Sequence, residues 1–258
     1  MSDLKLTVTD GAARLVFDRP RVLNALSPDV LAKLIHACAE LSSNDRVRVV
    51  VLEGAGNCFS AGADLPAFMA ALGGSDAHGI ADLGRRATNA IAGLPQITIA
   101  GIRGHCVGGG LVLAGACDVR IAAEDARFLI PELDAGIPLG WGGLGHLVRL
   151  VGETAAADWV LSCRPFGAEE ALRTGLISRI VPATRLEREL GALSAAVARK
   201  PQSVLLTTKQ QLLSIRDGTF DAAEDAAALL AALRDPEALA TGRNYVSTHL
   251  APKAGPAS

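Results

Sequence analysis

Three consecutive glycines, Gly108 to Gly110, limit how this chain can fold more than any other stretch does. They separate an apolar run at 96–102, which predicts a strand, from an apolar run that predicts a helix ending at Ala116. Glycine costs a helix about 1 kcal/mol per residue, so glycines here indicate close packing or a ligand that touches the main chain. A helix that begins near Gly109 directs its first N–H groups and the positive end of its dipole at that space. The motif therefore predicts either tight packing of helix on strand or a site for negative charge.

The composition excludes two classes of partner. The chain has 258 residues, with 25 basic and 27 acidic side chains and a formal charge of −2. This balance provides neither the basic surface that nucleic acid requires nor a cationic face for a membrane. Hydrophobic residues make up 50% of the chain and aromatic residues 3%. So large an aliphatic fraction indicates a buried surface between subunits, and we expect a homo-oligomer.

The cysteines and the lack of a long apolar segment indicate a cytoplasmic protein. Five cysteines are scattered along the chain without a C-x-x-C pair, which favours reduced thiols in the core, and we expect no metal site. The N-terminus has no apolar segment typical of a signal peptide. The longest uncharged run, 87–102, contains Pro95, so we expect no membrane-spanning helix.

Strands and helices alternate along most of the chain. Residues 4–8 and 13–17 predict a hairpin, and Ser27 followed by Pro28 predicts the start of a helix. The further strands and helices have irregular lengths, which favours an α/β fold made of repeated strand-strand-helix units. The last 58 residues predict helices alone. We expect a core domain at 1–200 and a helical region at 201–258.

A second helix start lies in the segment "SAGADLPAF". Asp64 is the expected N-cap and Pro66 fits the first turn, so N–H groups near Ala63 are also left without helical partners. The preceding residues Gly54 to Gly56 are similar to the start of a dinucleotide-binding fingerprint, but Phe59 replaces its last glycine. We therefore expect no dinucleotide site here.

Glu132 is the candidate catalytic acid or base. Its neighbours in "FLIPELDAGI" are almost all apolar, and a carboxylate in such surroundings is expected to have a raised pKa. A raised pKa suits a general base that works near neutral pH. Taken alone, the segment equally permits a glutamate in a surface turn. Asp134 lies beside Ala135 and Gly136, which favours a turn or capping role for that carboxylate.

Four ordered motifs resemble the enoyl-CoA hydratase/isomerase (crotonase) superfamily: "FSAGADL", "GHCVGGG", "CDVRIA" and "PELDAGIP". The resemblance extends over nearly the full chain. It implies a crotonase-like spiral of strand-strand-helix units, with C-terminal helices that build homotrimers, often paired into hexamers. It also implies an acyl-CoA thioester as substrate, with coenzyme A as part of the substrate and no separate cofactor.

The same resemblance implies where the substrate binds. The backbone N–H groups of Ala63 and Gly109 correspond to the family's oxyanion hole, which holds the thioester oxygen. Glu132 corresponds to a catalytic carboxylate of the family. Positions that usually hold the coenzyme A part correspond to Arg21 and to the segment 61–65, which contains Ala61, Ala63, Asp64 and Leu65.

One departure from the hydratase pattern bears on the reaction. Hydratases of the family carry a second glutamate two residues after the glycine triplet, where this chain has Val112. Loss of one of two acid/base groups lowers a rate by about 10² to 10⁴, which disfavours hydration. The pattern is similar to the Δ3,Δ2-enoyl-CoA isomerases, in which one glutamate shuttles a proton between C2 and C4. Members that act on dienoyl-CoA esters carry an acid where this chain has Gly140.

We therefore expect an isomerase that uses Glu132, with three alternatives left open. The chain could be an enoyl-CoA hydratase, an acyl-CoA thioester hydrolase, or an acyl-CoA binding protein without catalysis. Trp141 lies near the expected acyl pocket, where it could shape the chain-length preference or fill the core.

Overall fold

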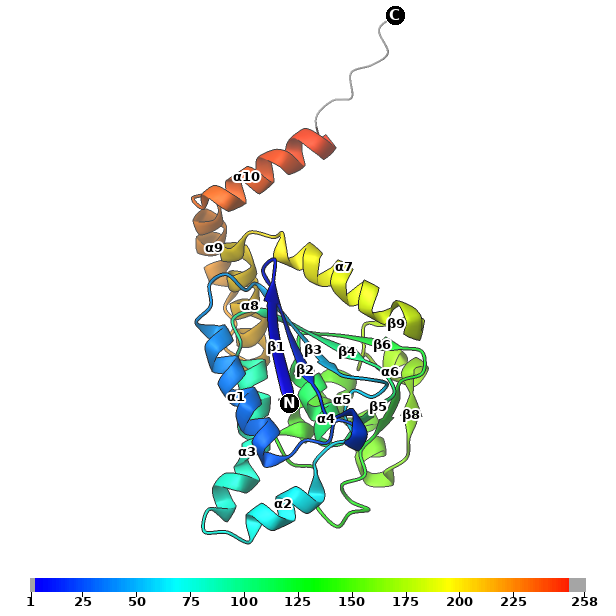
Figure 1. Ribbon diagram of the computed structural model, residues 1–258. Helices are drawn as coiled ribbons and strands as arrows, with labels where there is room; N and C mark the ends of the chain where they lie inside the picture. Colours follow the sequence, from blue (N-terminus) through cyan, green and yellow to red (C-terminus); the bar gives the residue numbers. More distant parts are fainter. Residues whose placement is uncertain (1–2, 251–258) are drawn as a thin grey trace, which may run out of the picture. The chain divides into compact units, whose positions relative to one another are not determined.

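The computed structural model describes residues 3–250 and divides into two compact units, one ending at Ala198 and the other beginning at Arg199. Figure 1 shows the strands gathered in the first unit and only helices in the second. The mixture of strands and helices confirms the α/β class expected from the sequence.

A six-stranded sheet forms the frame of the first unit. The strand order is β1-β2-β3-β4-β6-β9, and every neighbouring pair is parallel except the β1–β2 hairpin. The hairpin confirms the sequence prediction, and its turn residues Asp10 and Gly11 have the positive φ angles that a tight hairpin turn requires. The strands are β1 Leu4–Thr9, β2 Ala12–Phe17, β3 Val49–Gly54, β4 Ile97–Ile102, β6 Val119–Ala123 and β9 Arg179–Val181.

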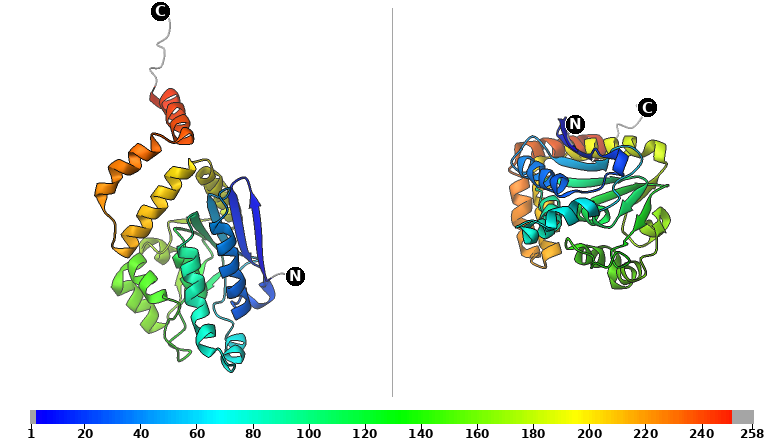
Figure 2. Two further views of the ribbon diagram at one scale, coloured as in Figure 1. Left: turned by 90° about the vertical axis from the view of Figure 1, so that its left-hand side faces the viewer. Right: turned by 60° about the horizontal axis from the view of Figure 1, so that its bottom comes forward.

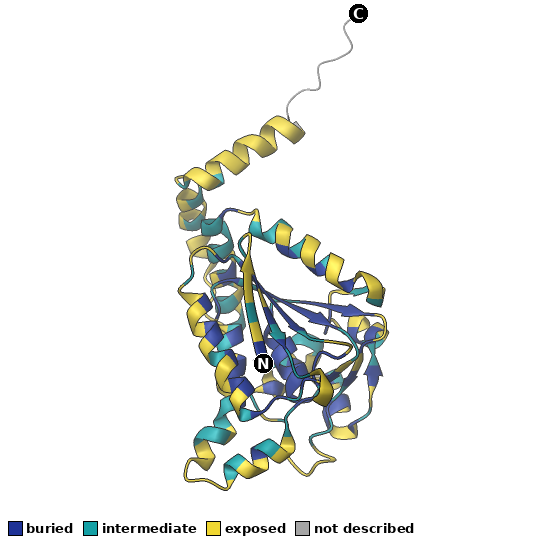
Figure 3. Ribbon diagram, viewed as in Figure 1, coloured by how far each residue is buried: buried dark blue, intermediate teal, exposed yellow. Residues whose placement is uncertain are grey.

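Both faces of this sheet are covered. Along β3, Val49 and Val51 belong to the cluster beneath α7, whereas Val50 and Leu52 belong to the main core. Helix α7 (Leu186–Ala198) contacts β2, β3, β4 and β6, and Figure 1 shows it across this face. Such double coverage explains why the central strands are continuous apolar runs and appear buried in Figure 3.

Helices cover the opposite face. Helix α1 (Pro28–Ser42) and α3 (Ala77–Ala92) run side by side, as Figure 2 shows. Helix α4 (Gly109–Ala116) packs against α3 and against α5 (Gly143–Ser162). The hydroxyl of Ser27 accepts a hydrogen bond from Val30 N, which confirms the predicted N-cap of α1.

A second sheet is small but important for the site. It consists of β5 (His105–Val107), β7 (Arg127–Leu129) and β8 (Phe166–Gly167); β5 pairs with β7 in parallel and β7 with β8 in antiparallel orientation. Ser60 extends it through a parallel bridge to Cys106. The sequence does not predict this sheet, because strands of two or three residues have too short a pattern to be recognised.

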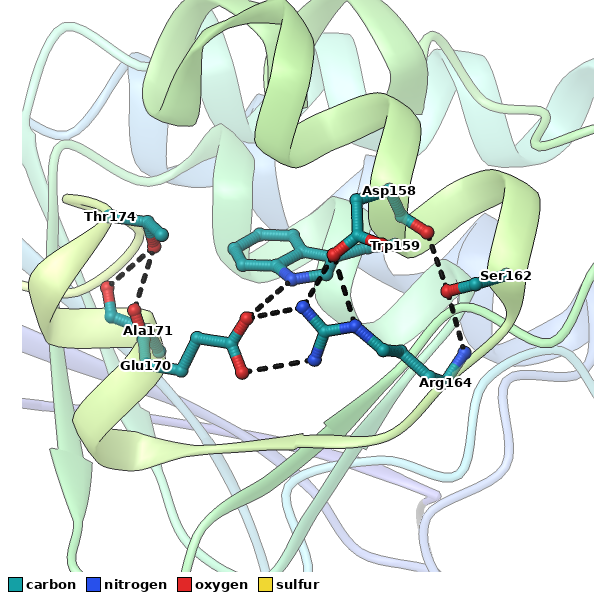
Figure 4. A network of polar contacts seen from close by, with 7 residues as sticks. All are labelled: Asp158, Trp159, Ser162, Arg164, Glu170, Ala171 and Thr174. Atoms are coloured by element: carbon teal, nitrogen blue, oxygen red, sulfur yellow. Dashed lines mark hydrogen bonds and ion pairs between the residues drawn. The ribbon is translucent and has the colours of Figure 1, made fainter.

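A polar network joins α5 to α6 (Ala168–Arg173). Figure 4 shows Arg164 between Asp158 and Glu170, with N···O distances of 3.0 Å to each carboxylate. The indole of Trp159 donates to Glu170 at 3.1 Å and stacks on Phe166 of β8. Arg164, with help from Trp159, lowers the pKa of Glu170 to about 2.

The second unit is entirely helical in its described part. Its helices are α8 (Gln202–Asp217), α9 (Asp225–Ala232) and α10 (Pro236–Tyr245), with the short turns Ala222–Glu224 and Val246–Leu250. Leu229 and Leu230 of α9 are exposed. A role of this unit in trimers stays a prediction. No helix within residues 3–250 is long and apolar enough to cross a bilayer.

Candidate active site

Three short extended segments run in parallel and end at the same edge. Ser60 N donates to His105 O at 3.0 Å, Val107 N donates to Ser60 O at 3.0 Å, and Gly108 N donates to Leu129 O at 2.9 Å. These hydrogen bonds align the segment around Ser60 with β5 and β7. Because parallel segments bring their carboxyl ends together, the residues that follow them meet in space. Those residues are Ala63, Gly109 and Glu132.

Two main-chain N–H groups at this edge have no acceptor among residues 3–250. Leu26 forms a parallel bridge with Ala63: Leu26 N donates to Gly62 O, and Asp64 N donates to Leu26 O. The N–H of Ala63 itself therefore points away from Leu26. Gly109 is the first residue of α4, so its N–H has no partner within the helix. Neither N–H donates a hydrogen bond to any residue that the structure describes. A Cβ atom at Gly62 would lie 3.7 Å from Gly109 N, so the two segments are adjacent.

The glycine triplet is required by three different neighbours. A Cβ atom at Gly108 would overlap the carboxylate of Glu132, and one at Gly109 would overlap the indole of Trp141. A Cβ atom at Gly110 would lie 2.8 Å from the Cβ of Ser60. Each glycine therefore has a close neighbour, but packing of the helix on an extended segment applies only where Gly110 meets Ser60, because Glu132 and Trp141 lie in turns. The unpaired N–H of Gly109 also leaves room for a ligand, as the second sequence-based prediction requires.

The carboxylate of Glu132 faces a cavity. Its Oε2 atom is buried and has no hydrogen-bond partner within the described residues. Desolvation raises the pKa of Glu132, and a hydrogen bond from its own main chain opposes part of that rise. The direction agrees with the sequence-based expectation. Asp134, by contrast, is exposed and does not line the cavity.

The cavity itself is apolar apart from Glu132. Its volume is about 330 Å³, and Glu132 is the one ionisable side chain among its lining residues in the described part of the chain. Such a lining suits an alkyl or alkenyl group better than a polar one. Besides Glu132, the cavity is lined by residues that include Ala63, Phe68, Gly109, Val112, Leu139 and Trp141.

Two buried polar residues that no sequence motif indicates, Asn24 and Ser60, support this edge. Asn24 is fully buried, and its side-chain amide donates to Ala55 O at 2.9 Å and to Cys58 O at 2.7 Å. The hydroxyl of Ser60 donates to Asn24 O at 2.9 Å and accepts from Gly62 N at 3.1 Å. Both residues hold the segment that leads to the N–H of Ala63. Their burial depends on partners far along the chain, so the local sequence gives no sign of it.

The residues expected to hold coenzyme A lie on two neighbouring loops. Arg21 is exposed on the short 3₁₀ turn Pro20–Val22 and does not line the cavity. That turn is close to Ala61, whose N–H donates to Leu23 O at 2.9 Å. Leu65 is 47% exposed at the cavity.

Asp64 has two structural partners. Its side chain accepts from Ala67 N at 3.2 Å, which confirms the predicted N-cap of α2 (Leu65–Leu72). It also pairs with Arg19 at 2.9 Å. Asp64 can therefore contribute to a ligand site mainly through its main chain. No cluster of three metal-ligating side chains is found among residues 3–250.

Known proteins resemble this chain in sequence. The sequence profile of the family described as "Enoyl-CoA hydratase/isomerase" matches residues 7–227. A "Probable enoyl-CoA hydratase" of Bacillus subtilis (strain 168) is 35% identical over 215 residues, which are 83% of each chain. A "Crotonyl-CoA hydratase" of Syntrophomonas wolfei is 34% identical over 198 residues, which are 76% of each chain.

Solved structures share the fold. The crystal structure of an enoyl-CoA hydratase from Bacillus anthracis superposes with a TM-score of 0.86 and 26% identity, and the match covers 96% of this chain and 97% of the other. A crystal structure titled as an "Enoyl-CoA Hydratase/Isomerase Family Member" gives a TM-score of 0.85 with 31% identity and covers 95% of each chain. These matches confirm the crotonase-like fold that the four sequence motifs imply.

Proposed function

Because this chain belongs to the enoyl-CoA hydratase/isomerase family, we propose that it is a Δ3,Δ2-enoyl-CoA isomerase, with Glu132 as the proton carrier. The substrate in this proposal is a 3-enoyl-CoA thioester and the product is the 2-enoyl-CoA isomer. The acyl chain lies in the apolar cavity, and its thioester oxygen points at the N–H groups of Ala63 and Gly109.

The proposed reaction moves one proton. The carboxylate of Glu132 takes a proton from C2, and the electron pair of that C–H bond spreads over a dienolate whose negative charge gathers on the thioester oxygen. The two N–H groups stabilise this oxyanion, and each such donor contributes about 3 kcal/mol in a site that excludes water. The protonated Glu132 then returns the proton at C4, and the double bond moves from C3–C4 to C2–C3. No atom is gained or lost.

The lone carboxylate carries this proposal. Val112, the position at which the hydratases of the family hold a second glutamate, is 1% exposed and lines the same cavity as Glu132. One carboxylate is sufficient to carry a proton between two carbons. Addition of water is favoured by a second group that orients or protonates the water molecule, and the cavity lining offers none within the described residues.

Hydration is the second candidate function, and the names of the relatives favour it. The Bacillus and Syntrophomonas proteins that share 35% and 34% identity are both named hydratases. If this chain hydrates its substrate, a group other than an acid at position 112 has to hold the water molecule.

Parallel assays separate the two candidates. Purified protein is given 3-hexenoyl-CoA and crotonyl-CoA, and formation of the conjugated ester and loss of the conjugated double bond are followed by absorbance. We expect fast isomerisation of the first ester and slow hydration of the second. Rapid hydration of crotonyl-CoA without isomerisation of 3-hexenoyl-CoA would reject the proposal. The Glu132→Gln variant should lose isomerisation and still bind the esters; unchanged turnover would exclude Glu132 from the reaction.

We further propose that Arg21 and the main chain of 61–65 hold the nucleotide part of coenzyme A, and that the helical second unit forms homotrimers or hexamers. Replacement of Arg21 with alanine should weaken binding of acyl-CoA more than it changes turnover. Light scattering on the full chain measures the mass of the assembly directly.

A further inference from the structure

Trp141 adopts a backbone conformation that a large side chain rarely takes. Its φ is +61°, and the following Gly142 has a φ of +75°. Gly143 N donates to Gly140 O at 2.9 Å and closes a four-residue turn around them. Positive φ at both central residues defines a turn type in which glycine and asparagine prevail. Something other than backbone preference must therefore keep a tryptophan at this position.

The indole lies in a socket made by two glycines and a phenylalanine. A Cβ atom at Gly84, in the middle of α3, would overlap the indole ring, and so would a Cβ atom at Gly109, at the start of α4. The ring of Phe68 lies 6.1 Å away, centroid to centroid. The side chain therefore fills the space between α3 and α4 that the two glycines leave empty. This packing holds the turn in its unfavourable conformation.

The same ring is a wall of the catalytic cavity. Trp141 lines the cavity together with Glu132 and Gly109, and its six-membered ring contacts Gly109 itself. Gly109 carries one of the two N–H groups that point at the thioester in the proposed function. The indole therefore stands beside the acyl carbons closest to the reacting atoms.

We propose that Trp141 is the specificity-determining residue of the acyl pocket and that it restricts the site to slender, unbranched acyl groups. This inference rests on the proposed acyl-CoA function. Removal of the indole opens the space at Gly84 and Gly109, and a bulky apolar acyl group such as a phenyl group then fits there. Apolar cavities left by large-to-small substitutions accept apolar groups of matching size.

Binding of saturated esters tests the proposal independently of the reaction. Calorimetry gives the Kd of butyryl-CoA and of phenylacetyl-CoA for the original protein, Trp141→Ala and Trp141→Phe. The preference for phenylacetyl-CoA over butyryl-CoA should rise by about tenfold or more in Trp141→Ala and less in Trp141→Phe. An unchanged preference in both folded variants overturns the proposal. Trp141→Phe keeps the test available if the alanine variant does not fold.

The second tryptophan provides a matched control and a spectroscopic probe. The chain contains two tryptophans, and Trp159 packs on Phe166 and does not line the cavity. Trp159→Phe should leave the ester preference unchanged, and Trp141 then becomes the sole source of tryptophan emission. Butyryl-CoA should shift or quench that emission, whereas free coenzyme A should not. Binding of butyryl-CoA by calorimetry without any change in emission rejects the proposed contact.

Gly84 tests the socket from outside the cavity. Gly84→Ala should displace the indole and weaken binding of butyryl-CoA by about tenfold, and Trp141→Ala in the same chain should restore part of the loss. If Gly84→Ala weakens binding of butyryl-CoA and Trp141→Ala in the same chain restores none of it, the indole does not occupy the socket.

The results also separate this inference from the proposed reaction. If the esters bind with the expected preferences but 3-hexenoyl-CoA is not isomerised, the proposed reaction fails and this inference stands. Isomerisation with an unchanged preference in Trp141→Ala rejects this inference alone.

Discussion

The carboxylate of Glu132 occupies the space that a side chain would need at Gly108. Gly108 also has a φ of +47°, which an alanine adopts only with strain. Gly108→Ala should therefore move the proton carrier away from the substrate without changing any charge. Because a displacement of about 1 Å lowers a rate by about 10², we expect kcat for the isomerisation to fall by about that factor. Steady-state kinetics on 3-hexenoyl-CoA measures the change.

Gly115, in the helix that Gly108 precedes, offers the matched control. A Cβ atom there would only touch Leu150, at 3.6 Å, and would disturb nothing near the cavity. Gly115→Ala should keep kcat and raise stability by about 0.5–1 kcal/mol, since alanine suits a helix interior better than glycine. If both variants lost the same activity, the effect would come from α4 as a whole and not from contact with Glu132.

Glu132 should lower the stability of the protein above acidic pH. Burial raises the pKa of Glu132, so the folded chain binds this proton more tightly than the unfolded chain does. Stability from this group is then present at low pH and is lost as the pH rises through the raised pKa. Glu132→Gln should melt at a higher temperature than the original protein at pH 8, and the two melting temperatures should converge below pH 4.5, the ordinary pKa of a glutamate. If Glu132→Gln and the original protein melted at the same temperature at pH 8 as well as at acidic pH, the carboxylate of Glu132 would not be desolvated.

The hydroxyl of Ser60 should matter for both stability and turnover. It joins Asn24 O to Gly62 N, and its loss in Ser60→Ala leaves both buried groups without a partner. Each unsatisfied group costs about 1–3 kcal/mol, which urea unfolding can measure. We also expect kcat to fall more than KM changes, because the N–H of Ala63 follows directly after Gly62. In both stability and kcat, Ser60→Cys should lie between the original protein and Ser60→Ala, since a thiol is a weaker donor and acceptor than a hydroxyl.

The ion pair between Arg164 and Glu170 should stabilise the protein until the pH is strongly acidic. Arg164 holds the pKa of Glu170 at about 2, below its ordinary value of 4.5, so this stability is present above pH 4.5 and is lost as the pH falls toward 2. Glu170→Gln should therefore lower the melting temperature at pH 7, and its difference from the original protein should vanish near pH 2. Glu169 is an exposed neighbour on the same helix, and Glu169→Gln should leave the melting temperature unchanged at both pH values.

The starts of the helices were predictable because they follow local rules. Ser27 and Asp64 both accept a hydrogen bond from the N–H three residues later, and α4 begins at Gly109 and ends at Ala116 as the pattern indicated. In each case the signal lies within a few residues of the sequence. The same rules predicted the hairpin at the N-terminus.

The alignment of the site was not predictable from these rules. It depends on the strands β5 and β7, which are three residues long, and on the bridge between Ser60 and Cys106. The indole of Trp141 likewise meets Gly84, a residue 57 positions earlier in the sequence, through the packing of α3 against α4. Such contacts between distant segments leave no periodic pattern that a single sequence can reveal. Glu132 was indicated by its apolar neighbours together with the resemblance of the segment "PELDAGIP" to the family, and its neighbours alone left a surface turn equally open.

Val112 is the position at which the proposed reaction can be redirected. Its side chain is buried and lines the cavity with Glu132, so Val112→Glu would place a second carboxylate at the site. Two acid/base groups can hold and activate water, and we expect hydration of crotonyl-CoA to rise by about tenfold or more. The free energy of unfolding should fall for two reasons. The two carboxylates repel each other, so each raises the pKa of the other. Position 112 also has little spare room, because a Cβ atom built at Gly143 would lie 2.5 Å from Cγ2 of Val112. Val112→Gln has nearly the same shape without the acid and should not gain hydration. If Val112→Glu folds and binds crotonyl-CoA but hydrates it no faster, the missing carboxylate is not what limits hydration in this protein.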